Sequence, residues 1–154
     1  MSLLRLCLFG GFQLSTDGKS LAAVNTPRLQ SLIAYLALHP GAVHTRQQLA
    51  FLLWPDSTEA QARTNLRKLL LHLRQACPAL EEAVHADGQT LQWRANASAS
   101  ISVDVTEFEN ALANGELERA ISLYTGGLLP NCYDDWIAPE RERLSLMPLR
   151  IGLT

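Results

Sequence analysis

The sequence predicts an α+β fold in which strands come first, three helices and a β-hairpin follow, and helices alone complete the chain. Three observations support this order. Short apolar runs bounded by glycine turns open the chain, apolar residues at helical spacing fill residues 27–76, and the turn dipeptide Asp87-Gly88 lies between two further strand-like runs. We expect two units, residues 1–95 and 101–154, with the small polar residues 95–100 as a linker.

The first unit opens with a small antiparallel sheet. Residues 4–9 and 12–15 have the composition of strands and are joined at Gly10-Gly11, and Asp17-Gly18 is a turn dipeptide that precedes a further short strand. A helix then begins at Thr26-Pro27, because threonine is a good N-cap and proline is tolerated in the first helical turn.

Two more helices are predicted from their caps. Thr45 and Gln48 form a capping-box pattern at the start of a short helix, which Pro55 ends. Ser57 or Thr58 caps a longer helix that extends to about Ala76. A hairpin with its turn at Asp87-Gly88 follows.

The second unit is predicted to be helical. Asp104 and Glu107 have the spacing of a capping box, which predicts a helix over 104–112. Further helices are expected over 116–124 and from about 135 to 150. The first two of these helices have the arrangement of one tetratricopeptide-like helical pair.

Composition excludes several classes of protein. The chain has 154 residues, of which 47% are hydrophobic and 18% charged, as in ordinary globular proteins. No apolar run approaches the roughly 18–20 residues that cross a bilayer. The three cysteines are far apart and form no C-x-x-C pair, which favours a reducing cytoplasm over a disulfide framework or a zinc ribbon. We expect a cytoplasmic protein without membrane contact.

The net charge of -2 conceals an uneven distribution. Residues 1–80 contain eight Lys and Arg against three acidic residues, whereas residues 81–154 contain five Arg against twelve acidic residues. The first part therefore has a net charge of +5 and the second of -7. An asymmetry of this kind indicates a basic unit joined to an acidic one, or a chance distribution of surface charge.

Strands, three helices and a hairpin are the layout of a winged helix-turn-helix, in which the third helix enters the major groove of DNA. On a helical wheel, the residues of helix 59–76 that lie opposite or beside its leucine stripe include four permanent cations and one acidic residue, Glu59. A solvated helix face would more often alternate acidic and basic residues at i,i+4 spacing.

The candidate DNA-binding residues fall into three groups. Thr64, Asn65, Lys68 and His72 are candidates for groove or backbone contacts, and Arg63, Arg67 and Arg74 could contact DNA or bridge to neighbouring elements. Arg46 begins the second helix, where helix N-termini often meet phosphate, and Arg94 lies on the hairpin; each is a phosphate contact or an ordinary surface arginine.

Leu71 differs from its neighbours on this predicted surface, because it is apolar and points in the same direction as Lys68. It either touches the methyl group of a thymine or is buried by a neighbouring element.

Several motifs together resemble the SARP-type transcriptional activators. They are Leu36-Ala37-Leu38-His39-Pro40-Gly41, Thr45-Arg46-x-x-Leu49, Leu53-Trp54-Pro55-Asp56, Ala62-Arg63-x-Asn65-Leu66-Arg67, Leu73-Arg74, Val103-Asp104-Val105-x-x-Phe108-Glu109, Gly115-x-Leu117-x-x-Ala120-x-x-Leu123-Tyr124-x-Gly126 and Trp136-x-x-x-Glu140-Arg141-x-Arg143-Leu144. The resemblance extends over nearly the whole chain, and the order of the motifs is more specific than any one of them.

This resemblance implies a response-regulator-type winged helix followed by the start of a bacterial transcriptional activator domain with tetratricopeptide-like helices. It also implies binding to double-stranded promoter DNA, as a homodimer on direct repeats, and recruitment of RNA polymerase in the cytoplasm. An activator domain of this family normally continues for many more helices, so we expect a fragment of a longer regulator or a truncated form.

Two other classes compete with this prediction. An enzyme is disfavoured because the sequence has no phosphate-binding glycine loop, no G-x-S-x-G and no H-E-x-x-H, and His39 and His44 have no third metal ligand nearby. We therefore expect no catalysis, no cofactor and no metal. The alternative is a protein-binding adaptor that makes no contact with DNA.

Overall fold

The computed structural model describes residues 4–94 and 101–150, with side chains as far as residue 144. The strands are β1 (Leu4–Cys7), β2 (Gln13–Thr16), β3 (Lys19–Ser20), β4 (Val43–Thr45), β5 (Val84–Ala86), β6 (Thr90–Trp93) and β7 (Ile101–Val103). The helices are α1 (Pro27–Leu38), α2 (Arg46–Leu53), α3 (Glu59–Ala76), the 3-10 turn η1 (Pro78–Glu82), α4 (Asp104–Ala113), α5 (Leu117–Leu123) and α6 (Ile137–Arg150). The predicted α+β class is confirmed.

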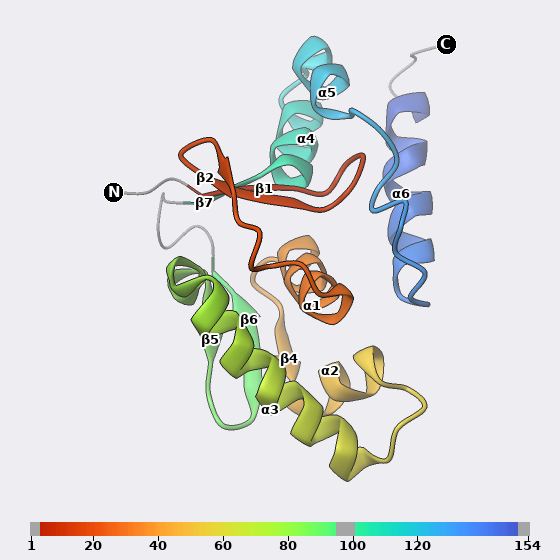
Figure 1. Ribbon diagram of the computed structural model, residues 1–154. Helices are drawn as coiled ribbons and strands as arrows, with labels where there is room; N and C mark the ends of the chain where they lie inside the picture. The colour runs from red at the N-terminus through yellow and green to blue at the C-terminus, as the bar shows by residue number, and fades with distance from the viewer. Residues whose placement is uncertain (1–3, 95–100, 151–154) are drawn as a thin grey trace.

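Two sheets organise these elements. The first has the order β3-β2-β1-β7, with β1 antiparallel to β2 and parallel to β7, so that Leu6 pairs with both Leu14 and Val103. The second has the order β4-β6-β5 and is antiparallel throughout. In Figure 1, α4 and α5 lie on one side of the first sheet, and α1 lies on the other side, toward α2, α3 and the second sheet.

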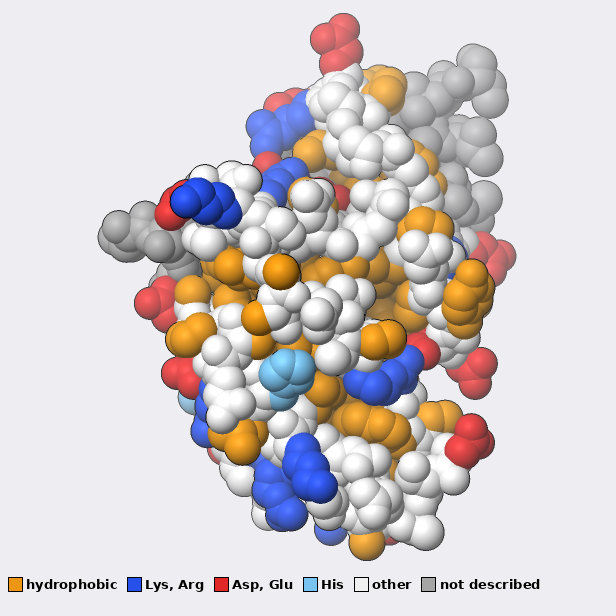
Figure 2. Space-filling view, in the orientation of Figure 1, with side chains coloured by type: hydrophobic (Ala, Val, Ile, Leu, Met, Phe, Trp, Pro, Cys, Tyr) orange, Lys and Arg blue, Asp and Glu red, His pale blue; other side chains and the backbone are white. Residues whose placement is uncertain are grey.

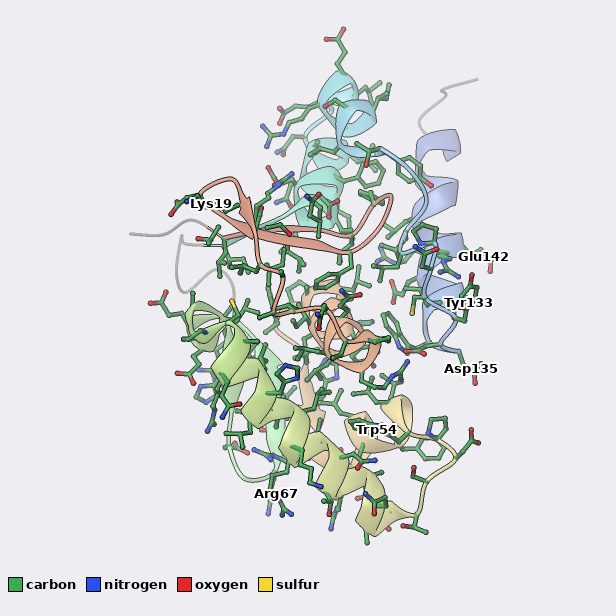
Figure 3. All side chains as sticks on the ribbon, in the orientation of Figure 1. Lys19, Trp54, Arg67, Tyr133, Asp135 and Glu142 are labelled. Carbon is green, nitrogen blue, oxygen red and sulfur yellow. The ribbon has the colours of Figure 1, made fainter. Side chains whose placement is uncertain are left out.

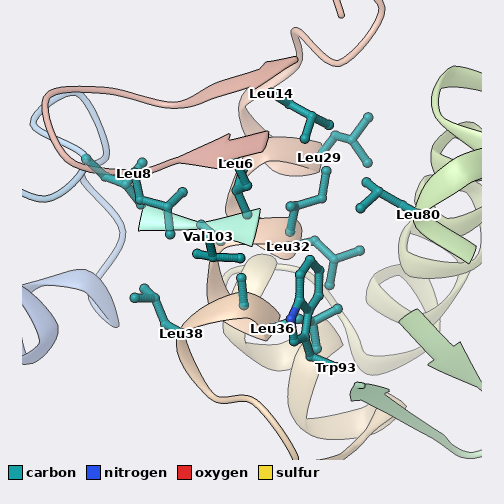
Figure 4. Close-up of a cluster of buried hydrophobic side chains, with 14 of the residues drawn as sticks. Leu6, Leu8, Leu14, Leu29, Leu32, Leu36, Leu38, Leu80, Trp93 and Val103 are labelled. Atoms are coloured by element: carbon teal, nitrogen blue, oxygen red, sulfur yellow. The ribbon is translucent and has the colours of Figure 1, made fainter. Parts of the chain in front are cut away.

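The core is continuous from one sheet to the other. Alternate residues of β1 are buried, α1 is buried along most of its length, and Trp93 of β6 is 1% exposed. Figure 4 shows leucines of the first sheet facing leucines of α1, with Trp93 and Leu80 beyond them. Apolar burial of this kind contributes roughly 25 cal/mol per Å², so α1 is the element that joins the two sheets.

Most predicted helix starts are confirmed. The Thr26 hydroxyl caps α1, Thr45 and Gln48 form a complete capping box on α2, and Thr58 caps α3. The predicted hairpin is β5–β6, with Asp87 and Gly88 in its turn. The predicted linker, residues 95–100, lies outside the described residues, and the division into units 1–95 and 101–154 stays a prediction.

The predicted capping box of Asp104 and Glu107 is wrong. Val103 is the N-cap of α4, and no side chain caps this helix. The Asp104 carboxylate, 3% exposed, instead accepts hydrogen bonds from the backbone N–H groups of Leu8 at 2.9 Å and Phe9 at 3.0 Å, besides that of Val105 at 2.8 Å. Burial raises the pKa of Asp104, although the three backbone donors oppose that rise. Glu107 forms ion pairs with Arg5 and Arg119.

Strand β7 was not predicted, and it brings the second part of the chain into the first sheet. It is only three residues long, and its partner β1 lies at the other end of the described chain. Together with the Asp104 hydrogen bonds, this strand anchors α4 to the end of β1.

We expect Asp104→Asn to lower the free energy of unfolding by roughly 2 kcal/mol, because an amide nitrogen would face buried N–H donors that the carboxylate now accepts. Chemical denaturation measures this change. The control is Asp135→Asn, a change at an exposed site that should leave stability within about 0.5 kcal/mol. Equal stability of Asp104→Asn and the wild type would contradict the proposed anchoring role.

Two histidines and two other aromatic residues form a cluster between α1, β4 and the start of α6. The ring of Tyr35 lies 4.5 Å from that of His39, 5.1 Å from that of His44 and 5.3 Å from that of Trp136. His39 Nε2 lies 3.0 Å from Glu140 Oε1, whereas His44 Nε2 is buried without a hydrogen-bond partner among the described residues. Burial, and secondarily repulsion from His39, lower the pKa of His44.

This environment predicts a pH-dependent stability. In the unfolded chain His44 takes up a proton near pH 6.5, whereas in the folded chain it does so only at lower pH. Stability should therefore fall as the pH drops below about 6.5. Melting temperatures between pH 7.5 and 5.5 should decrease less for His44→Phe than for the wild type, and equal decreases would contradict the assignment.

Candidate nucleic-acid interface

Helix α3 has one buried face and one open face. Ala62, Leu66, Leu69, Leu70 and Leu73 are buried, as the sequence predicts. On the opposite side Lys68, Leu71 and Gln75 are exposed and Thr64 is half-buried. The Thr58 hydroxyl accepts a hydrogen bond from Gln61 N at 3.2 Å, which fixes where the helix begins and so which residues face outward.

Three predicted arginines meet around one surface hollow of about 520 Å³. Arg46 belongs to the start of α2, whereas Arg63 and Arg67 belong to α3. The remaining lining residues are Thr45, Gln47, Leu66, Gly88, Gln89 and Thr90. The hollow therefore lies where α2, α3 and the turn of the β5–β6 hairpin come together, and Figure 3 shows Arg67 beside that turn.

Strand β4 places α2 next to the hairpin. Thr45 pairs with Thr90 in the second sheet, and the backbone N–H of Arg46 donates to Gln89 O at 2.8 Å. The Arg46 Nε–H donates to Asp87 O at 2.9 Å, which orients its guanidinium along the turn. Because Arg46 still has its other guanidinium N–H groups available, this hydrogen bond leaves it able to contact an anion.

The hairpin turn is fixed by one carboxylate. Asp87 Oδ1 accepts hydrogen bonds from Gln89 N at 2.8 Å and Thr90 N at 2.7 Å, and Oδ2 accepts from the Thr90 hydroxyl at 3.1 Å. Hydrogen bonds from the Gln89 and Thr90 amides lower the pKa of Asp87. This acidic group stays charged at neutral pH, but its lone pairs are used within the turn.

The cations of the first 80 residues differ in their acidic neighbours. Arg5 pairs with Glu107, and Arg28 pairs with Asp134 at 2.5 Å, so both are neutralised by the acidic part of the chain. Arg67 and Lys68 have no acidic partner among the described residues, and both are exposed. Figure 2 shows Lys and Arg side chains gathered over the lower part of α3 and the adjoining hairpin. The open face of α3 therefore has a positive charge that the protein itself does not neutralise.

Arg63 and Arg74 are weakly paired. Arg63 Nε lies 3.9 Å from Glu59 of its own helix, and Arg74 Nε lies 3.5 Å from Glu81 of η1. All four side chains are about 60% exposed, and such surface pairs contribute at most about 1 kcal/mol. Phosphate could replace either carboxylate at little cost.

The structure does not bring the other predicted residues into the hollow. Asn65 and His72 lie on the far flank of α3, and Asn65 Oδ1 accepts a hydrogen bond from Gln61 Nε2 at 2.8 Å. Arg94 lies at the end of β6 remote from the turn, where its backbone N–H donates to Ala83 O and its Nε–H donates to Gln92 Oε1.

Sequence reasoning did not identify Thr45, Gln47 and Thr90 as part of the hollow. The signal that could have found them is the alternating Val43-His44-Thr45, which forms β4 and brings the start of α2 beside the hairpin. Three residues are too few for a periodic pattern to stand out.

Two further searches concern the described part of the chain alone. In residues 4–94 and 101–144, no group of three or more His, Cys, Asp or Glu side chains has an arrangement that could hold a metal ion. Among the described helices, none combines the length and the apolar character that a membrane span requires.

Comparison with known proteins identifies a shared fold. No protein-family model matches the sequence, and no curated protein matches it. Among solved structures, the chain is similar to EmbR of Mycobacterium tuberculosis, determined in complex with a low-affinity phosphopeptide, with a TM-score of 0.74 and 18% identity. The similarity covers 97% of this chain and 44% of EmbR, so the chain spans less than half the length of that protein. At this identity the likeness shows the fold alone.

Because the capping box holds the start of α2 against the hairpin, we expect Thr45→Ala to lower the free energy of unfolding by about 1 kcal/mol. Thr106→Ala, at an exposed position of α4, is the control and should change stability by less than about 0.5 kcal/mol. Chemical denaturation of both variants checks this, and an unchanged midpoint for Thr45→Ala would contradict it.

Proposed function

We propose that this chain is a transcription regulator that binds double-stranded DNA through a winged helix-turn-helix formed by α1 to α3 and the β5–β6 hairpin. Helix α3 is the recognition helix, which enters the major groove, and the hairpin is the wing. The α4–α5 pair begins a tetratricopeptide-like activator domain. This function requires no catalytic step, metal or cofactor.

The observation that carries the proposal is the group of Arg46, Arg63 and Arg67 around one hollow, next to the exposed and unpaired Lys68. These cations come from two helices that meet the same hairpin turn. A phosphate backbone is the extended polyanion that such a surface fits, because Arg binds phosphate through two parallel hydrogen bonds and Lys acts as a point charge.

The dimensions of α3 agree with this role. A helix of 18 residues is about 27 Å long, and the major groove of B-DNA is about 12 Å wide and admits one helix. With its leucines buried, α3 can present Thr64 and Lys68 to base edges while Arg46 and Arg63 meet the flanking phosphates.

The regulatory part of the proposal rests on two further supports. The motifs resemble SARP-type activators, and the fold is shared with EmbR over nearly the whole chain. We propose that the protein acts in the cytoplasm as an activator that recruits RNA polymerase to promoters, and that two copies bind direct repeats. Arg94, Asn65, His72 and Arg74 would then make peripheral contacts with the DNA.

The test is enrichment of genomic DNA fragments at two salt concentrations, followed by measurement of affinity for the enriched site. We expect the double variant Arg67→Ala, Lys68→Ala to lose most enrichment. In log Kd against log salt, its slope should be smaller in magnitude by about 2, because each lost phosphate contact accounts for roughly 0.9.

Lys19→Ala is the matched control. Lys19 and Lys68 are the only lysines of the chain, both are exposed, and Figure 3 shows Lys19 at the opposite end of the molecule from Arg67. It should bind DNA as the wild type does. Equal losses for Lys19→Ala and the α3 double variant would show only a nonspecific effect of charge, and no enrichment by the wild type at low salt would exclude DNA binding.

One observation favours the second candidate, a protein-binding adaptor. A hollow of about 360 Å³ between α2 and α3 is lined by Phe51, Trp54 and Pro55, and Phe51 is 70% exposed. An exposed aromatic beside an apolar hollow is typical of protein contacts. If DNA enrichment fails while Phe51→Ala abolishes capture of a partner protein, the adaptor is the better description.

A further inference from the structure

We propose that Leu71 determines sequence specificity by contacting the C5-methyl group of thymine in the major groove. This inference rests on the proposed function, because it names the base that the open face of α3 recognises. Its basis is the position and exposure of a single apolar side chain.

The structure decides between the two explanations of Leu71. The residue is 55% exposed, so no neighbouring element of the described chain buries it. The other leucines in the central part of α3, at positions 66, 69, 70 and 73, are at most 8% exposed. Leu71 is thus the one leucine of this helix that faces solvent, and it does so from the middle of the open face.

The residues around Leu71 are basic or polar. Arg67 and Lys68 precede it by four and three positions, and Arg74 and Gln75 follow it by three and four, which places all four beside it on the helix surface. All four are exposed. Among them only Arg74 has an acidic partner, Glu81, in an exposed pair.

This combination fits DNA better than a protein partner. The centres of protein interfaces are depleted in charge and are larger than one side chain. Here a single apolar group has three permanent cations around it, and a partner must supply negative charge on both sides of a small apolar group. A thymine methyl group in the major groove, flanked by the phosphates of two strands, has that arrangement.

The alternative polar contacts are available from neighbouring residues. Lys68 and Gln75 continue the row of Leu71 along the helix and can donate to the O4, N7 or O6 atoms of adjacent bases. Leu71 has no hydrogen-bonding group and can only distinguish thymine by its methyl group. The structure therefore predicts a required A·T pair beneath the middle of α3.

The experiment replaces each thymine of the enriched site, one at a time, by deoxyuridine, which lacks only the methyl group. Fluorescence anisotropy then gives the Kd of each duplex for the wild type and for Leu71→Ala. For the wild type, we expect one or two replacements to weaken binding roughly fourfold each, the value for one buried methyl group. Leu71→Ala should bind the thymine and uracil duplexes equally.

Ile121→Ala is the matched control, because Ile121 of α5 is also a large exposed hydrophobic residue, at 49%, but lies on the opposite side of the first sheet from α3. It should retain the wild-type preference for thymine. Because Leu71 is exposed and alanine favours helices, the variant should fold normally, which its melting temperature checks.

Each outcome bears on a different claim. If the wild type binds its site but tolerates uracil at every position, or if Leu71→Ala keeps the same penalty, the contact with thymine is excluded while DNA binding stands. If the wild type binds no DNA at all, both this inference and the proposed function are excluded.

Discussion

The arrangement of this protein depends on the buried carboxylate of Asp104. Its oxygens accept hydrogen bonds from the backbone N–H groups of Leu8 and Phe9, which follow β1, while β7 immediately before it pairs with β1 itself. A buried carboxylate is costly unless backbone donors satisfy it, and here they do so from the far end of the chain. The acidic second part of the chain is thereby held against the first sheet and cannot move toward α3.

This attachment explains how an overall acidic protein can have a basic surface. The acidic residues of the second part meet the cations on their own side of the molecule: Glu107 pairs with Arg5, and Asp134 pairs with Arg28. Arg67 and Lys68, on the open face of α3, have no acidic partner among the described residues. The net charge of -2 is therefore an average over two surfaces of opposite character.

Local signals predicted much of the fold. Threonine caps at positions 26, 45 and 58 and the Asp87-Gly88 turn act within a few residues, so the sequence alone identified the starts of three helices and the hairpin. Strand β7 and the role of Asp104 depend on contacts across more than 90 residues, which no local pattern encodes. Asp104 and Glu107 have the spacing of a capping box, yet burial of Asp104 against β1 prevailed over local capping.

The candidate site shows the same division. The open face of α3 follows from helical periodicity, so Lys68 and Leu71 could be placed on it from the sequence. The meeting of Arg46 with Arg63 and Arg67 could not, because it depends on β4, a strand of three residues that pairs with β6. Arg94 was predicted from its place on the hairpin, but a hairpin has two ends, and the residue lies at the end away from the turn.

The most direct test of the central claim is an NMR titration of the 17.0 kDa chain with a DNA duplex that carries the enriched site. DNA binding through the proposed surface predicts that amide signals change in α3, at the start of α2 and in the hairpin turn, while those of α4 and α5 keep their positions. Changes confined to α4 and α5, or to the surroundings of Phe51, would contradict the claim that α3 and the hairpin form the DNA-binding surface.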